Sequence, residues 1–396
     1  MKAADRDALL AVFGRFRRAS IPAAGVRVVW RQEGGQFLYA VKDAKEAQML
    51  TAAELRVGEP LMAAILDARP EANVLIRSLP DYAGGITQIR NCPSFRPALD
   101  DALKMIGNRV MLAGSDQPGR IQGILQNKDA CIVRPSKKYG EPAPYVLVLG
   151  KTPAQATVTT LVLEKACRAL LEGTLLGGMK RISFWLLLQK GLTFEGSWET
   201  DGLSGALQIN EIEGREKVVH CVNWLLEENL IQTAPGAVSV RLDGAHMLLA
   251  ARGCGDRPLS PEDVVRVRIQ TLENDGGIAP SFDLKLQAAI MDRYEDVGCC
   301  VLTRAGASSV FAACRQPVPI TGREDGDLPG DRTGYASARL RPIIKALGRT
   351  VSGACILGNR GAVITGKSVE DVIDRCGTME DAARRYLGSK VRELRG

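Results

Sequence analysis

Residues 361–368 read GAVITGKS and fit the pattern G-x-x-x-x-G-K-[ST] of loops that bind nucleotide phosphates. Such a loop must be flexible, because its backbone amides wrap around phosphate between a strand and a helix. The residues between the two glycines, AVIT, favour a β-strand instead. The pattern therefore predicts a strand that ends in a Gly-Lys turn, with Ser368 capping the next helix. An ATPase or kinase is the less favoured alternative.

A cysteine and two histidines could also do chemistry. Cys254 lies between Arg252 and Arg257 in the stretch ARGCGDR, and neighbouring cations can lower the pKa of a thiol. No histidine is near it in the sequence, so we interpret it as an ordinary loop cysteine. The two histidines of the chain, His220 and His246, fall on a predicted helix and a predicted hairpin, and we interpret both as structural.

The composition predicts a globular, cytoplasmic protein. The chain has 396 residues, of which 45% are hydrophobic, enough for a large core in two or three domains. Ten cysteines without CxxC spacing indicate core residues in a reducing compartment rather than a disulfide framework. Charges interrupt the apolar residues of the N-terminal stretch, and no later run could span a membrane, so we expect neither a signal peptide nor a membrane partner.

The charge of the chain does not favour nucleic acid as a partner. The net charge is +7, from 52 basic and 45 acidic residues, and aromatic residues make up 5% of the chain. Nucleic-acid binders more often concentrate their charge in one patch with aromatic residues between the cations. The basic clusters FGRFRRA, RPSKKYG and ARRYLGSKVRELRG are far apart in this sequence.

Two pairs of segments indicate an internal repeat. PLMAAILDARPEANVLIR (60–77) and KLQAAIMDRYEDVGCCVLTR (285–304) both read as a helix, a turn and a strand that ends in arginine. GKTPAQATVTTLVLEKACRALL (150–171) is similar to GKSVEDVIDRCGTMEDAARRYL (366–387), and the Gly-Lys pair precedes Glu164 and Glu380 by the same interval. We therefore predict a tandem duplication, with domains at 1–185 and 213–396 and a linker region at 186–212.

Each half predicts helices that cover a sheet. Asp243 and Gly244 in SVRLDGAHMLLA have hairpin chemistry, which indicates that part of each sheet is antiparallel. Runs such as VSVRL, VVRVRI, CCVLT and GAVIT predict strands. Helical periodicity is found at 97–107, 153–172, 212–228, 284–293, 336–347 and 367–387.

The second half resembles the class II aldolase/adducin family over residues 216–390. APGAVSVRLDGAHMLLAARGCGD is similar to the family's Gly-Asn-x-Ser-x-Arg strand and hairpin, and IAPSFDLKLQAAIM to its Pro-Ser-Ser-Glu helix start. CCVLTRAGAS and CILGNRGAVITGKSVEDVIDR resemble its His-x-His and Asn-His-Gly strands. The resemblance implies an α/β fold: a three-layer αβα domain with a largely antiparallel central sheet, here duplicated in tandem.

The resemblance also implies a metal site that this sequence has lost. The family holds a divalent metal, usually zinc, with the three histidines of these motifs, and their positions here carry Leu302, Arg304 and Arg360. Leucine has no donor atom and arginine stays protonated, so we expect no metal and no cofactor. By the same comparison of letters, the first half carries Leu75, Arg77 and Lys128.

Other family positions imply a degraded catalytic and anion-binding site. The acidic residue that transfers protons in the family falls on Asp283, although we favour the interpretation that Asp283 is a helix N-terminal residue that completes the cap set by Ser281. Arg304 and Arg360 could hold an anionic small molecule in place of the metal, or could pair with Asp283. The full anion-binding set implied by the resemblance is Gly236, Arg252, Gly253, Ser281, Arg304 and Arg360.

Two functions remain open at this point. In the first, the chain is a metal-free, catalytically degenerate relative that acts as a binding, regulatory or assembly module. In the second, it is a zinc-independent aldolase, lyase or epimerase that acts on a sugar phosphate or hydroxy acid, with Asp283 as the proton-transfer group and Arg304 and Arg360 as electrophilic clamps. The family commonly forms fourfold tetramers, so a fused pair implies a homodimer with a pseudo-fourfold arrangement, and a homologous, metal-competent partner subunit is a further alternative.

Overall fold

The structure is a computed structural model that forms two compact units, residues 1–171 and 172–396. The unit boundary falls near the end of helix α7 (Pro153–Gly173), whereas most of the linker region expected at 186–212 lies outside the described residues. Within the described part of the chain, no helix is long and apolar enough to cross a membrane. The described residues are 2–136, 143–182, 209–232, 238–251, 259–275, 278–320 and 330–395.

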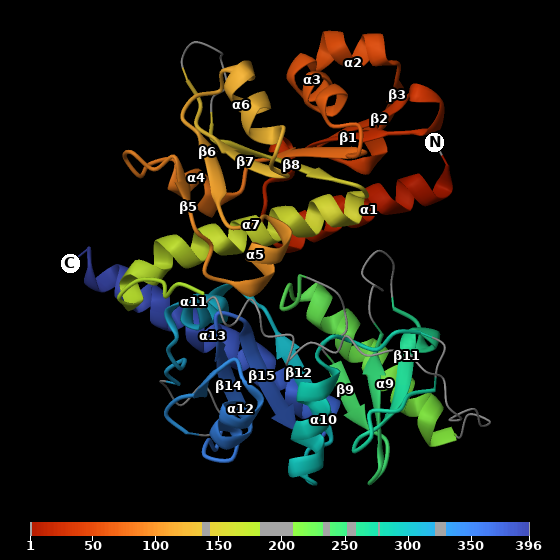
Figure 1. Cartoon of the computed structure of the whole chain (residues 1–396), viewed down its shortest axis with the longest axis vertical. Helices are drawn as coiled ribbons and strands as arrows, with labels where there is room; N and C mark the ends of the chain where they lie inside the picture. The colour runs from red at the N-terminus through yellow and green to blue at the C-terminus, as the bar shows by residue number, and fades with distance from the viewer. Residues whose placement is uncertain are drawn as a thin grey trace. The chain divides into compact units, whose positions relative to one another are not determined.

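The first unit is built on an eight-stranded sheet in the order β3-β2-β1-β4-β8-β7-β6-β5 (Figure 1). All neighbouring strands are antiparallel except β6 and β7. The strands are β1 (Arg27–Arg31), β2 (Phe37–Val41), β3 (Gln48–Leu50), β4 (Val74–Ser78), β5 (Ser94–Phe95), β6 (Val110–Ala113), β7 (Ala130–Val133) and β8 (Tyr145–Gly150).

Helices cover both faces of this sheet, because its strands carry apolar side chains on both sides. Leu9, Val12 and Phe13 of α1 and Leu161 of α7 pack on one face. Leu55 of α2, Met62 of α3 and Leu125 of α6 pack on the other. The result is a three-layer αβα unit. Its helices are α1 (Ala3–Arg18), α2 (Ala52–Gly58), α3 (Pro60–Ala68), α4 (Asp81–Ile86), α5 (Asp100–Met105), α6 (Pro118–Leu125) and the greater part of α7.

The second unit has a seven-stranded sheet in the order β11-β10-β9-β12-β15-β14-β13, again antiparallel except for one pair, β13 and β14. The strands are β9 (Val238–Arg241), β10 (His246–Ala250), β11 (Val264–Arg268), β12 (Cys299–Thr303), β13 (Gly334–Ser337), β14 (Ala354–Gly358) and β15 (Gly361–Gly366). Strand for strand, this order follows that of the first unit from β3 to β6.

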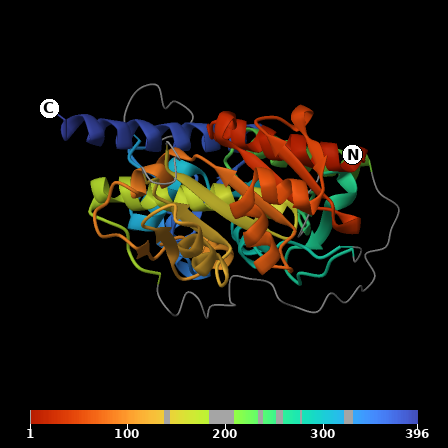
Figure 2. The ribbon, with the colours of Figure 1, turned by 90° about the horizontal axis from the view of Figure 1, so that it is seen from above.

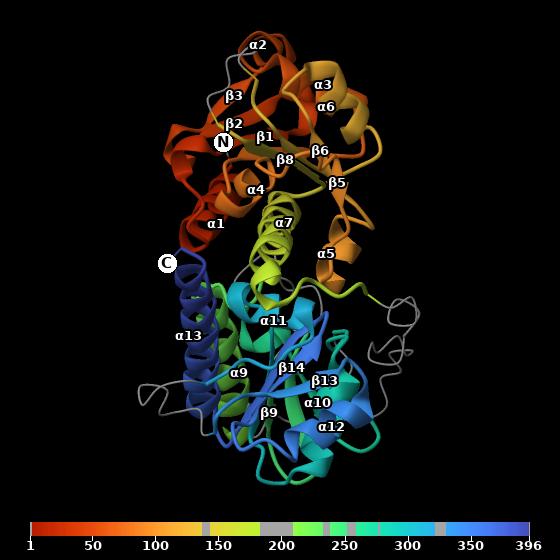
Figure 3. The ribbon, with the colours of Figure 1, turned by 90° about the vertical axis from the view of Figure 1, so that its left-hand side faces the viewer.

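Helices α9 and α13 lie together on one face of the second sheet, and α10 and α12 lie together on the other (Figure 3). Figure 2 shows α13 as one uninterrupted helix that leads to the C terminus. The helices are α9 (Ile209–Glu227), α10 (Leu284–Arg293), α11 (Gly306–Cys314), α12 (Leu340–Leu347) and α13 (Val369–Glu393).

An arginine at the end of the first strand holds the same loop in both units. Arg31 donates to the carbonyl oxygen of Leu66 at 2.7 Å, and its backbone N–H donates to Asn73 at 2.7 Å. Arg241 donates to the carbonyl oxygen of Met291 at 2.7 Å, and its N–H donates to Gly298 at 2.8 Å. In each unit the arginine thereby ties the first strand to the connection between helix and strand that the sequence repeat contains.

A glutamate caps a helix start in both units; Glu164 is half-buried and Glu380 is buried. Glu164 of α7 accepts hydrogen bonds from the backbone N–H groups of Tyr82 and Ala83 at 2.7 and 2.8 Å. Glu380 of α13 accepts from Ala307 and Ser308 at 2.6 and 2.9 Å. These glutamates are the two that the repeat aligned, and their shared task explains why both long helices carry a charge on a packed face.

The candidate phosphate loop is a strand. Residues 362–365 pair with β12 on one side, and residues 362–364 pair with β14 on the other, so their amides belong to the sheet. Ser368 Oγ accepts from the N–H of Asp371 at 3.2 Å and caps α13, as predicted. Thr152 caps α7 in the same way through Gln155, at 3.2 Å.

Most predicted elements are found, with one shift. β9 and β10 form the expected hairpin, in which Asp243 Oδ1 accepts from the N–H groups of Ala245 and His246, both at 2.7 Å. The helix expected at 336–347 begins at Leu340, because residues 334–337 pair with β14 as the strand β13.

Candidate functional site

Asp283 and Arg360 form a buried ion pair in the second unit. Asp283 is the residue that precedes α10, and Arg360 lies in the turn between β14 and β15. An Nη2 hydrogen of Arg360 is donated to Asp283 Oδ1. Each residue is 7% exposed. The candidate proton-transfer acid and one of the candidate anion-binding cations therefore neutralise each other in the core.

The turn that carries Arg360 is held on both sides. Asn359 has φ +64°, and its side chain accepts from Arg315 Nε at 3.0 Å and donates to the carbonyl oxygen of Lys180 at 2.9 Å. Gly361 has φ +144°, and a Cβ there would lie 2.2 Å from the carbonyl oxygen of Thr303. Only glycine fits this backbone conformation and this close approach. The turn thus fixes the backbone position from which the side chain of Arg360 extends.

Leu302 and Arg304 lie beside this turn. Leu302 is buried in β12 opposite Val363. Arg304 follows β12, is half-buried, and donates its backbone N–H to Leu230 at 3.0 Å. A Cβ on Gly361 would be 3.3 Å from Arg304 Cγ, so the stem of Arg304 lies against the turn. The structure therefore brings the three family metal positions to one end of β12 and β15.

These three positions do not fit a metal ion. Leucine offers no donor atom, and the two guanidinium groups remain protonated. Among the described residues, no group of three or more His, Cys, Asp and Glu side chains could hold a metal. His220 lies in α9, and the imidazole Nδ1 of His246 is 3.0 Å from the carboxylate of Asp243.

Half of the predicted anion-binding residues can be located. Gly236, Arg252 and Gly253 lie outside the described residues, as does Cys254. Ser281 is 4% exposed, and its Oγ accepts from the N–H of Asp283 at 3.1 Å. Ser281 thus supports the start of α10, which is the capping role that the sequence offered as the alternative to a ligand site.

Sequence reasoning missed two buried polar side chains of the second unit, one on α10 and one on β9. Gln287, one turn after Asp283, is fully buried, and neither its Oε1 nor its Nε2 has a hydrogen-bond partner within the described structure. Ser239 Oγ of β9 is likewise without a partner there. Burial, and then the charge of Asp283, raise the pKa of Cys300, the residue opposite Ser239. A glutamine within the apolar pattern LKLQAAIM was the signal that could have located this cluster.

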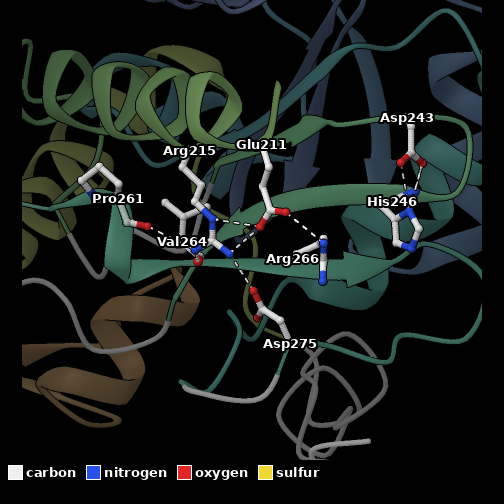
Figure 4. A network of polar contacts seen from close by, with 8 residues as sticks. All are labelled: Glu211, Arg215, Asp243, His246, Pro261, Val264, Arg266 and Asp275. Atoms are coloured by element: carbon white, nitrogen blue, oxygen red, sulfur yellow. Dashed lines mark hydrogen bonds and ion pairs between the residues drawn. The ribbon is translucent and has the colours of Figure 1, made fainter. Parts of the chain in front are cut away.

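A second charged network lies where α9 meets β11 (Figure 4). Glu211, which is 1% exposed, accepts from Arg215 at 2.8 Å and from Arg266 at 2.9 Å. Arg215 also lies 2.6 Å from Asp275 and donates to the carbonyl oxygen of Pro261 at 3.2 Å. Two carboxylates and two guanidinium groups balance, so we assign this network to the packing of α9 on the sheet.

Strand register aligns the first unit differently from the sequence letters. Val74 of β4 lies opposite Gly150, as Cys299 of β12 lies opposite Gly366. Counting along the strands from these positions, the counterparts of Leu302, Arg304 and Arg360 are Arg77, Leu79 and Pro144. The comparison of letters places Leu75, Arg77 and Lys128 at these positions instead. The register differs from it by two residues at the first two positions, because β4 and β12 both end near an arginine, and it puts Pro144 in place of Lys128.

The three counterparts line one cavity of about 660 Å³ in the first unit. Its wall also contains Arg27 of β1 and Gln88. A different hollow of about 730 Å³ in the second unit runs along β13 and α12 and contains no predicted site residue. The equivalent ends of the two sheets therefore carry an open cavity in the first unit and a closed ion pair in the second.

Comparison with known proteins finds a family model that matches part of the second unit, and proteins similar to part of the chain. Residues 216–387, from within α9 to within α13, match the family model for the Class II Aldolase and Adducin N-terminal domain. A 5-methylthioribulose-1-phosphate/5-deoxyribulose-1-phosphate aldolase of Rhodospirillum rubrum is 28% identical over 159 residues, which are 38% of this chain and 70% of that protein.

Similar solved structures include two sugar-phosphate aldolases. An L-fuculose 1-phosphate aldolase gives a TM-score of 0.41 at 17% identity, with 49% of this chain and 90% of the other covered. The L-fuculose 1-phosphate aldolase from Glaciozyma antarctica PI12 gives a TM-score of 0.42 at 19% identity, with 48% and 78% covered.

Proposed function

Because residues 216–387 match the class II aldolase and adducin family, we propose that this chain is a cytoplasmic class II aldolase-like protein that has lost metal-dependent catalysis. It acts as a binding, regulatory or assembly module. The observation that carries this proposal is the buried pair of Asp283 with Arg360. A carboxylate held by a guanidinium in the core is poorly placed to act as a general base, since the ion pair occupies its oxygen and burial keeps it from substrate.

Both units descend, in this proposal, from one duplicated domain. Three features support it: the shared strand order, the arginines Arg31 and Arg241 on equivalent loops, and the glutamates Glu164 and Glu380 on equivalent helix starts. Each of these contacts joins segments far apart in sequence, so convergence would have to recreate several independent long-range pairs.

The proposed assembly is a homodimer. The family resemblance implies a fourfold arrangement of single domains, and two chains of two units each would supply four. A homologous partner subunit that carries metal-binding histidines is the competing arrangement. In that case a mixed assembly, rather than a homodimer, would be the working form.

A second candidate is a zinc-independent lyase or epimerase that acts on a sugar phosphate or hydroxy acid. It is favoured by Gln287, whose buried amide lies one turn from Asp283 with no hydrogen-bond partner among the described residues. Buried polar atoms of this kind are costly and are often retained for a ligand. For this candidate to hold, the carboxylate of Asp283 must leave Arg360 when substrate enters.

Metal content and molar mass, measured on one preparation, test the proposal. Tag-free protein grown with added zinc is analysed by plasma mass spectrometry and by light scattering. We expect less than one tenth of an equivalent of zinc, manganese or iron per chain, together with the mass of a dimer. Near-stoichiometric metal would overturn the loss of metal chemistry, and a monomer would overturn the assembly. Cleavage of fuculose 1-phosphate that survives EDTA would select the second candidate.

A further inference from the structure

Two arginines face each other across the neighbouring strands β1 and β4 of the first unit. Arg27 is directly opposite Arg77 in the antiparallel register, and both side chains line the cavity of about 660 Å³. Like charges at directly opposite positions destabilise a strand pair. Other interactions must therefore offset the repulsion between Arg27 and Arg77.

Neighbouring side chains hold each guanidinium in place. Arg27 Nη1 donates to both carboxylate oxygens of Glu59, at 2.9 and 3.2 Å. Glu59 also accepts from the hydroxyl of Tyr39 at 2.6 Å, and burial, followed by this contact, raises the pKa of Tyr39. The guanidinium carbon of Arg77 lies 4.5 Å from the centre of the Tyr145 ring, in a cation–π contact. The two cations are thus positioned before any ligand arrives.

The rest of the cavity wall suits an organic ligand. Leu79, Pro80 and Pro144 give it an apolar side, and Gln88 contributes an amide. The backbone of Gly84 and Gly85 also lines it. A volume of about 660 Å³ lies within the range of small-molecule sites, which combine apolar walls with a few placed polar groups. It is far larger than an inorganic ion needs.

We propose that this cavity binds a small organic phosphate, with the phosphate group against Arg27 and Arg77 and the organic part against the proline side. Guanidinium groups match the geometry of phosphate oxygens through paired N–H donors. Asp81 also lines the cavity, but it is exposed, whereas Arg77 is 7% exposed. Screening by water weakens the repulsion from Asp81 more than the attraction of Arg77.

This inference names a ligand class for the proposed binding module and in that sense rests on the proposed function. The two can fail separately. Metal content and molar mass report on the family positions at Leu302, Arg304 and Arg360, whereas the phosphate site depends on β1 and β4 of the first unit.

Calorimetric titration of the full chain with phenyl phosphate tests the inference, with inorganic phosphate as the second probe. We expect phenyl phosphate to bind more tightly, because only it reaches the apolar wall. R77Q and R27Q should each weaken its binding by about tenfold or more. D81N should tighten it by about threefold, since one negative charge leaves the wall. R56Q is the matched control, because Arg56 is exposed and paired with Asp67 at 2.9 Å outside the cavity.

A variant that keeps charge separates binding from folding. R77K retains a cation and much of the packing but loses the forked donor geometry, so it should bind several-fold more weakly than the parent while its thermal unfolding midpoint stays close to that of the parent. Three results would overturn the inference: no heat of binding to the parent chain, unchanged affinity in folded R77Q or R77K, or equal weakening in R56Q.

Discussion

The two units place opposite arrangements at the same end of equivalent sheets. In the second unit, Arg360 turns inward and closes on Asp283. In the first, Arg27 and Arg77 line an open cavity. The contacts that build the scaffold, such as those of Glu164 and Glu380, are the same in both. The difference teaches that the contacts which determine this fold are separate from those which determine its site, so a site can close or change chemistry while the scaffold persists.

The interactions left to each carboxylate set the energetic difference between the two ion pairs. The side chains of Arg360 and Asp283 are 7% and 10% exposed, and those of Arg27 and Glu59 are 36% and 13% exposed. Substitution of the arginine leaves a mostly buried carboxylate in either unit, but Glu59 keeps the hydrogen bond from the Tyr39 hydroxyl at 2.6 Å, whereas Asp283 loses the ion pair with Arg360. The second-unit pair should therefore be the more sensitive of the two to substitution.

The largest expected effect is the loss of the second-unit pair. Arg360→Met should lower the free energy of unfolding by about 3–5 kcal/mol, because it leaves Asp283 as an unpaired buried charge. Arg27→Met, which breaks the first-unit pair, should cost less, about 1–2 kcal/mol, because Glu59 keeps the hydrogen bond from the Tyr39 hydroxyl. Urea unfolding followed by circular dichroism measures both.

The double variant D283L/R360M sharpens this prediction. Replacing both charges removes the unpaired carboxylate, so the double variant should regain most of the stability that Arg360→Met loses. Equal losses in Arg360→Met and Arg27→Met would break the comparison, since they would mean that Asp283 without Arg360 is as well stabilised as Glu59 with Tyr39.

Removal of the glutamate caps should give the next largest effect, and an equal one in both units. At pH 8, Glu164→Ala and Glu380→Ala each leave two backbone N–H groups without an acceptor and should each cost about 3 kcal/mol. Glu393→Ala is the control, because the side chain of Glu393 is exposed and lies 2.8 Å from Lys390, in a surface ion pair. A cost below about 1 kcal/mol in one unit would contradict an equivalent role for the two caps.

The smallest expected effect is a pH dependence that originates in the first unit. Burial, with a contribution from Asp81, raises the pKa of Glu164 from 4.5 to about 7, although the amides of Tyr82 and Ala83 and the cation Arg168 act in the opposite direction. The folded state therefore holds this proton more tightly than the unfolded state does. The resulting stability is complete below pH 4.5 and is lost as the pH rises to about 7.

Comparison of the parent with E164Q isolates this effect. Between pH 5 and pH 6 the free energy of unfolding of the parent should fall by about 1 kcal/mol relative to E164Q. Urea titrations at both pH values provide the measurement, and carbon NMR of the labelled carboxyl gives its midpoint. A midpoint below pH 5 would show that the two amide hydrogen bonds outweigh burial.

The sequence predicts local features of this fold well. The Asp243 hairpin, the caps Ser368 and Thr152 and helix α10 follow from turn chemistry and from periods of 2 and 3.6 residues. The repeat also aligned Glu164 with Glu380, although it did not say what they bind. Local signals suffice for these features because each depends on neighbours in the chain.

Long-range register was beyond the sequence. Comparison of the sequence letters suggested that Arg77 corresponds to Arg304. The strand register instead places Arg77 at the position that corresponds to Leu302. The juxtaposition of Arg27 with Arg77 depends on how β1 pairs with β4, which no local pattern encodes. For the same reason, the cavity in the first unit was not predicted, whereas pairing of Arg360 with Asp283 was one of two stated alternatives.

A crystal structure grown with phenyl phosphate and zinc tests the contrast between the units most directly. We predict ligand density in the first unit against Arg27 and Arg77, with Arg360 still bound to Asp283 and no metal beside Leu302. Density for zinc or ligand between separated Asp283 and Arg360 side chains, with the first-unit cavity empty, would contradict the account.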